Sequence, residues 1–192
     1  MLTDRIMGAI TFKKGVYSEV ANDPSFTPTA WLIVAVVQLL TQLGTRASLV
    51  HQSSGFLRWI FGTIVYAALG VGGFALSAFL VSWAARQFFK ANFSFEQAVR
   101  SLGLAHIWNV VGLLGIVAVI SAALLCVVSP ITLIAGLAGL AATLIAIKEA
   151  SGMDWTGTIV SILVVLVVTL VIAAIAGGIL AVIGIGTSLI RG

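Results

Sequence analysis

The stretch that decides the fold lies between residues 59 and 83 and reads WIFGTIVYAALGVGGFALSAFLVSW. It contains no charged residue and carries a tryptophan at each end. A helix needs about 20 mostly apolar residues to cross the hydrocarbon core of a bilayer, so this stretch is long enough to span one. Only helices and closed barrels satisfy their backbone in lipid, and the alternation typical of barrel strands is missing here. We therefore predict a transmembrane helix.

Four further apolar stretches surround this one in the sequence. They lie near residues 30–49, 104–128, 131–147 and 156–186. Across all 192 residues, 60% are hydrophobic, only 8% are charged, and the mean hydropathy is +1.19. The sequence thus predicts an all-α, polytopic integral membrane protein. Its fold is expected to be a helical bundle with five transmembrane helices, formed by residues 1–192 as a single domain.

The flanking cations predict the orientation of the bundle. The N-terminal segment and the second and fourth connections hold Arg5, Lys13, Lys14, Arg86, Lys90, Arg100 and Lys148. The opposite side holds fewer: Arg46, Arg58 and Arg191. Because cytoplasmic loops carry the excess of lysine and arginine, the N-terminus is expected to be cytoplasmic and the C-terminus outside. All five tryptophans lie at or near the ends of predicted spans, as in an aromatic belt.

Residues 1–29 are too polar to insert. A broken apolar face in this segment opposes Arg5, Lys13, Lys14 and Glu19. We interpret the segment as one or two short cytoplasmic helices at the membrane surface, with the lysines near anionic lipid headgroups. The alternative is an arm that binds a protein partner. A second surface feature, RQFFKANFSFEQAVR at residues 86–100, mixes cations with phenylalanines and suits an anchoring helix or a docking surface.

Several helix ends can also be predicted. A hydroxyl N-cap followed by proline at the first helical position is expected twice, at Thr27–Pro28 and Ser129–Pro130. Other expected features are a capping box of Ser94 with Gln97, an ion pair of Glu96 with Arg100, a C-terminal stop at Gly152 and an N-cap at Asp154.

The sequence offers little that could perform chemistry. No lysine, arginine, aspartate or glutamate falls at the middle of a predicted span. His51 and His106 are isolated from one another and from other ligand types, whereas a metal site needs about three or four ligands. Cys126 is the only cysteine, so no internal disulfide is possible. We therefore predict no catalytic, cofactor-binding or metal-binding residues, no cofactor, and no enzyme activity. Because the positive charge is spread along the flanks, no nucleic-acid partner is expected.

The polar side chains inside the spans are uncharged. They are Gln38, Thr41, Gln42, Thr63, Tyr66, Ser77, Asn109, Thr158, Ser161 and Thr169. We interpret them as groups that make hydrogen bonds between helices, with a polar pocket at Gln38 and Gln42 as the alternative. Small residues four apart permit close helix contacts, within the chain or between chains, at Gly73 with Ser77, Ala135 with Gly139, and Ala173 with Gly177 and Ala181.

The order of these parts resembles a known family. It runs from Asn22-Asp23-Pro24, through NFSFEQAVRSLG at 92–103 and the turn at Ser129–Pro130, to AIKEASGMD at 146–154. Together these resemble the YIP-domain family, five-span membrane proteins whose eukaryotic members are named for interacting with Ypt/Rab GTPases. The chain lacks the longer N-terminal region of those members and has no proline in His106–Asn109. The resemblance therefore implies a compact, prokaryotic type of member in the cell membrane. It assigns no GTPase-binding role to any residue of this chain.

Three functions follow as hypotheses. The first is a non-enzymatic YIP-like membrane protein that acts through protein–protein contacts or membrane organisation. The second is an accessory structural subunit of a larger membrane complex, held through the small-residue helix faces by other subunits or by a second copy. The third, a small-solute transporter or channel, would use Gln38, Gln42 and Asn109 as a polar path. Membrane lipids are expected partners in each.

Overall fold

The computed structural model describes residues 1–47, 55–117 and 124–171, and the described part is helical throughout apart from short connections. Two short helices open the chain, α1 (Leu2–Ile10) and α2 (Val16–Ala21), followed by the 3-10 turn η1 (Pro24–Phe26). The long elements are α3 (Thr27–Thr45), α4 (Gly55–Phe89), α5 (Phe95–Ala105), the 3-10 helix η3 (His106–Ile116), α7 (Leu125–Ser151) and a last helix, Trp155–Val171.

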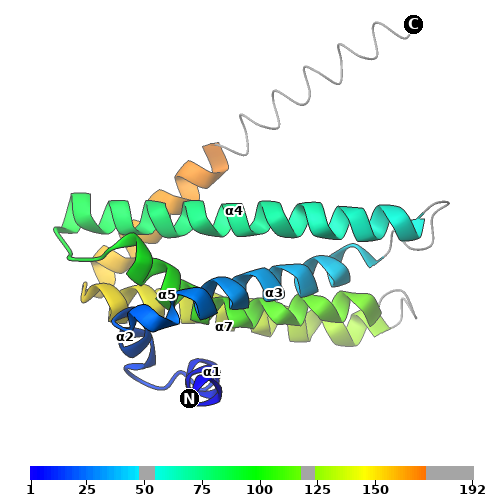
Figure 1. Ribbon diagram of the computed structural model, residues 1–192, viewed down its shortest axis with the longest axis horizontal. Helices are drawn as coiled ribbons and strands as arrows, with labels where there is room; N and C mark the ends of the chain where they lie inside the picture. Colours follow the sequence, from blue (N-terminus) through cyan, green and yellow to red (C-terminus); the bar gives the residue numbers. More distant parts are fainter. Residues whose placement is uncertain (48–54, 118–123, 172–192) are drawn as a thin grey trace, which may run out of the picture.

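The long helices alternate in direction and form an elongated bundle (Figure 1). The helices α3, η3 and α7 lie together on one side, and α4 runs along the whole length of the other. One end of the bundle collects α2, the end of α4, the start of α5 and the end of α7 (Figure 1). The last helix starts at this same end. The N-terminal segment, the second connection and Lys148 therefore meet at one end of the molecule.

Four of these helices are long and apolar enough to cross a membrane. They are Pro24–Thr45, Gly55–Phe89, Phe95–Ile116 and Cys126–Ser151. The last helix, Trp155–Val171, is apolar but shorter, and the rest of the predicted fifth span lies outside the described residues, together with Gly184 and Gly186. The class of fold, an all-helical membrane bundle, agrees with the prediction.

One predicted helix start is confirmed and one is wrong. The helix that leads into the third apolar stretch starts at Phe95, as the predicted capping box of Ser94 with Gln97 implied. The fourth was expected to start after Ser129–Pro130, but α7 starts at Leu125, with Leu124 as its N-cap. Pro130 lies inside this helix, a placement that membrane helices tolerate when neighbouring groups satisfy the freed carbonyl. Residues 125–128 thus belong to the fourth helix and not to the third.

The helix caps follow the prediction more closely. Ser94 and Gln97 form the full capping box, Gly152 ends α7 with a φ of 70°, and Asp154 accepts a hydrogen bond from the backbone N–H of Gly157 at 2.8 Å. At the start of α3 the prediction is off by one residue: Phe26 is the N-cap and Thr27 is already helical. The Thr27 hydroxyl instead accepts a hydrogen bond from Arg100 of α5.

The closest approach in the bundle is between α3 and η3. A β-carbon on Gly44 would lie 2.8 Å from Cα of Leu113, and one on Gly115 would lie 2.7 Å from the carbonyl oxygen of Gly44. Both distances are too short for real atoms, so this crossing requires glycine on both sides. The small-residue spacing considered from the sequence did not include these glycines.

Replacing Gly44 tests this crossing. The Gly44→Ala variant is expected to lose about 1–3 kcal/mol of stability, because the new methyl group overpacks against backbone that cannot turn away. Gly72→Ala on α4 is the matched control, since a β-carbon there meets no described atom within 4 Å. The control should gain up to about 1 kcal/mol from helix propensity. Thermal unfolding midpoints in detergent measure both effects, and a Gly44→Ala midpoint as high as that of the control would contradict the prediction.

Candidate functional site

The N-terminal segment docks on the end of the bundle. We call residues 2–26, which form α1, α2 and η1, the N-terminal cap. Within it Tyr17, Val20 and Ala21 are fully buried, and Phe26 is 3% exposed. The helix α2 packs on α5 and α7. Apolar burial therefore fastens this polar-looking segment to the helices that follow it.

A buried arginine of α5 also binds the N-terminal cap to the bundle. Arg100 on α5 is only 4% exposed. Its guanidinium donates to the carbonyl oxygen of Ala21, to the hydroxyl of Thr27 at 2.8 Å and to the carboxylate of Glu96 at 2.8 Å. The pair with Glu96 was predicted from the sequence, whereas the bonds to Ala21 and Thr27 were not. One side chain thus joins the end of α2, the start of α3 and the first turn of α5.

A second arginine organises the cap itself. Arg5 of α1 pairs with Glu19 at 3.0 Å and with Asp23 at 2.8 Å, and its guanidinium lies over the ring of Phe26. Hydrogen bonds from the Ser25 hydroxyl and from Arg5 hold the pKa of Asp23 below its ordinary value. These contacts keep α1 in place beside α2.

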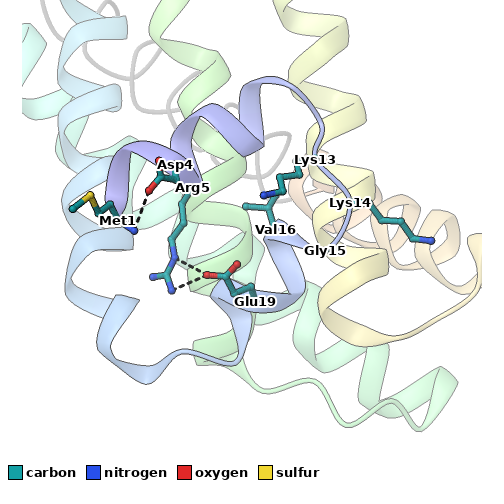
Figure 2. A pocket seen from close by; sticks show the side chains of 8 residues that line it. All are labelled: Met1, Asp4, Arg5, Lys13, Lys14, Gly15, Val16 and Glu19. Carbon is teal, nitrogen blue, oxygen red and sulfur yellow. Dashed lines mark hydrogen bonds and ion pairs between the residues drawn. The ribbon is translucent and has the colours of Figure 1, made fainter.

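Beside this pair lies a surface cavity of about 210 Å³ (Figure 2). It is lined by charges of both signs, from Met1, Asp4, Arg5, Lys13, Lys14 and Glu19. Figure 2 shows Arg5 directed at Glu19 and the terminal amine of Met1 directed at Asp4, while Lys14 extends away from both pairs. Because the terminal amine and Arg5 are paired with carboxylates and Asp4 and Glu19 also line it, this cavity is not a concentrated anion site.

The turn between α1 and α2 contacts the end of α7. The backbone N–H of Gly15 donates to a carboxylate oxygen of Glu149 at 2.9 Å. Tyr17 lies close by, and its hydroxyl donates to the carbonyl oxygen of Ala9 at 3.4 Å. Burial, and to a smaller degree the negative charge of Glu149, raise the pKa of Tyr17 to about 12. Nothing in the pattern of the sequence indicated that Glu149 would meet the N-terminal turn.

A polar cluster lies between α3 and η3. The ring of His106 has its Nε2 3.1 Å from the amide nitrogen of Gln38 and its Nδ1 3.1 Å from that of Asn109. The Thr41 hydroxyl donates to the carbonyl oxygen of Asn109 at 2.7 Å. A neutral imidazole has one N–H and one lone pair, so only one of these two amide NH2 groups can donate to the ring. We call Gln38, Thr41, His106 and Asn109 the polar cluster.

Two cavities adjoin this cluster and share Gln38. The first, of about 260 Å³, is bordered by Gln38, Thr41, Asn109 and residues of α7. The second, of about 360 Å³, is bordered by Gln38, His106 and residues of α4, α5, α7 and the last helix. The Gln38 amide fits against α4 because residue 70 is a glycine: a β-carbon on Gly70 would lie 2.6 Å from the Gln38 amide carbon. The sequence pointed to Gln38 and Asn109 but placed His106 apart from them.

The other polar residues singled out from the sequence lie elsewhere. Gln42 accepts a hydrogen bond from Arg46 and is not part of the cluster. The expectation of bonds between helices is wrong for Ser77 and Thr158, whose hydroxyls bond to carbonyl groups one turn earlier in the chain. The hydroxyls of Thr63 and Ser161 are buried without a hydrogen-bond partner among the described residues. His51 lies outside the described residues.

The remaining predictions concern small and aromatic residues. Ala135 and Gly139 do face a neighbouring helix, since a β-carbon on Gly139 would lie 3.3 Å from Cβ of Trp108. A β-carbon added at Gly73 would meet no described atom within 4 Å, and residues 173–181 lie outside the described part. Trp108 lies within the helix Phe95–Ile116. Its ring stacks on Phe12 from the N-terminal cap, with 5.6 Å between centroids.

These observations define an all-helical membrane protein whose N-terminal segment is folded onto its bundle. The Yip1 domain model matches residues 7–177, which is most of the chain. The protein therefore belongs to the Yip1 domain family, as the order of its sequence features indicated. This is a family of membrane proteins that is not known for enzymatic activity. Neither the curated proteins nor the solved structures include a significant match to the chain.

The role of Arg100 can be tested by substitution. In Arg100→Met the carbonyl oxygen of Ala21 loses its charged donor, at a cost of about 1–3 kcal/mol. We expect faster amide hydrogen exchange throughout α2, measured by mass spectrometry in detergent. Arg86→Met is the control, because Arg86 is exposed and, among the described residues, bonds only to a carbonyl of its own helix. Equal exchange in the two variants would show that Arg100 does not hold the cap.

The pKa of Tyr17 predicts how the cap responds to alkali. Because its folded-state pKa is raised from 10 to about 12, the contribution of Tyr17 to docking is fully present below pH 10 and is lost as the pH approaches 12. The chain has two tyrosines, so ultraviolet absorbance of the wild type minus that of Tyr17→Phe isolates this group. A midpoint near pH 12 is expected. A midpoint at the ordinary value near 10 would mean that the side chain is not buried.

Proposed function

We propose that this Yip1-family protein works without catalysis, through contacts with other membrane proteins. We further propose that it crosses the membrane five times, with the N-terminal cap on the cytoplasmic side and the C-terminus outside. The gathering of cations at one end of the bundle supports this orientation, because cytoplasmic flanks carry the excess of lysine and arginine. We also propose that it is a compact, prokaryotic type of member in the cell membrane.

The observation that carries the proposal is a face of α4 that the described residues leave exposed. This helix has 35 residues, or roughly 52 Å at 1.5 Å per residue, which exceeds the hydrocarbon thickness of a bilayer. Large apolar side chains along its first half are more than half exposed: Phe56, Leu57, Phe61, Ile64, Val65 and Leu69. Aromatic side chains are enriched at protein interfaces because they bury a large area at low entropic cost. A partner helix could pack along this face.

The N-terminal cap supports contact with the membrane surface. Leu2, Met7, Ile10 and Phe12 are exposed apolar side chains on or next to α1. Lys13 and Lys14 follow them directly and are also exposed. An exposed apolar edge beside lysines is typical of a helix that lies at a membrane surface with anionic lipids. We therefore propose that α1 lies in the headgroup layer beside the bundle.

Co-purification tests the proposal. The tagged wild-type chain, extracted from native membranes in mild detergent, is expected to bring down other membrane proteins in stoichiometric amounts, identified by mass spectrometry. Ile64→Trp on the α4 face should reduce that recovery about tenfold, the factor that corresponds to roughly 1.4 kcal/mol of lost binding. Leu137→Trp on the exposed face of α7 is the matched control and should leave recovery unchanged.

The outcomes separate the hypotheses. A fixed set of several different subunits would identify the chain as an accessory component of a larger complex. Recovery of a second tagged copy alone would identify a homo-oligomer. If the wild type is recovered as a monomer without any membrane-protein partner, the proposal of action through protein contacts is wrong.

A further inference from the structure

The larger cavity beside the polar cluster has the lining of a binding site. Its volume of about 360 Å³ falls in the range of small-molecule pockets. Residues from six helices border it, including Gln38, Gly73, Phe74, Ser77, His106 and Thr169. None of the described residues that line it is an aspartate, glutamate, lysine or arginine. The site therefore suits a ligand without net charge.

The polar end of the cavity can recognise a hydroxyl group. Among the described residues, the amide of Gln38 makes a hydrogen bond only to His106. An amide has two donor hydrogens and an oxygen that accepts, so Gln38 has capacity left toward the cavity. The ring of His106 is oriented by Asn109 on its other side and by the edge-on ring of Phe74, 5.5 Å away between centroids. An alcohol could both donate to and accept from this pair.

The surroundings of the cavity suit a hydrophobic tail. On α4, Leu69 and Leu76 flank the lining glycines and are exposed. On the last helix, Leu166 and Leu170 flank Thr169 and are more than half exposed. In a membrane these side chains face hydrocarbon. A ligand that is polar at one end and aliphatic at the other would match both the polar end of the cavity and these apolar surroundings.

The depth of the cluster matches the layer of lipid glycerol groups. Phe12 of the N-terminal cap stacks on Trp108, two residues after His106. If α1 lies in the headgroup layer, the polar cluster lies at or just below that layer. This step rests on the proposed placement of α1, but not on any protein partner.

We propose that the cavity binds a neutral glycerolipid with a free hydroxyl group, of which diacylglycerol is the simplest. The hydroxyl bonds to Gln38 and His106, and the acyl chains leave between α4 and the last helix. Within a low-dielectric surround such a hydrogen bond is strong, because water does not compete for it. The polar cluster is then a lipid site and not only a contact between α3 and η3.

Two neighbouring glycines allow a matched test. Gly73 lines the cavity and Gly72 does not, and a β-carbon on either meets no described atom within 4 Å. Gly73→Leu should therefore fill the cavity without disturbing existing contacts. Gly72→Leu places the same side chain on the same helix outside it. The full chain, reconstituted in phosphatidylcholine nanodiscs, is exposed to a photoactivatable diacylglycerol, and labelled peptides are measured by mass spectrometry.

We expect labelling of α4 and the last helix in the wild type and in Gly72→Leu, and a loss of at least about tenfold in Gly73→Leu. Gln38→Leu should reduce labelling about fivefold through the lost hydrogen bond, with Gln42→Leu as its control. Equal labelling of the two glycine variants, or no labelling of the wild type, would overturn the proposal. Unchanged helicity by circular dichroism checks that each variant folds. Because no protein partner is present, failure here is distinct from failure of the co-purification test.

Discussion

The rest of this structure depends on the burial of the Arg100 guanidinium. A charged group cannot be removed from water unless hydrogen-bond partners replace the water, and Arg100 finds them in three segments, at Ala21, Thr27 and Glu96. By meeting that requirement, the arginine joins the N-terminal cap to α3 and α5. Tyr17 and Gly15, which contact α7, then complete the attachment. At this end of the bundle, the N-terminal cap and the ends of α3, α5 and α7 therefore pack together as one folded unit.

The two sides of the bundle differ in how they use small residues. Between α3 and η3 glycines allow the backbones to touch, and the polar cluster lies within this tight contact. On α4 a β-carbon added at Gly72 or Gly73 would meet no described atom within 4 Å, so space remains there. The same residue type therefore closes one interface and leaves another open. The open side is where we place both the protein partner, along the first half of α4, and the lipid, beside its middle.

Prediction from sequence succeeded where a local rule applies. Ser94 with Gln97, Gly152 and Asp154 were assigned correctly, because a cap involves only residues within one turn of each other. It failed at Pro130, where the presence of a hydroxyl residue before proline suggested a helix start that the chain does not use. It also separated His106 from Gln38, since residues 68 positions apart in sequence carry no signal of their contact.

The helical membrane bundle could be predicted from the amino-acid sequence, and the order of the motifs was enough to indicate the Yip1 domain family. Both conclusions rest on hydropathy and local spacing, which are properties of the chain before it folds. The burial of Arg100, the contact of Glu149 with the turn at Gly15, and the two amides beside the ring of His106 became visible only in the folded molecule. Each of these joins residues distant in sequence, and the packing of whole helices, rather than any local preference, brings them together.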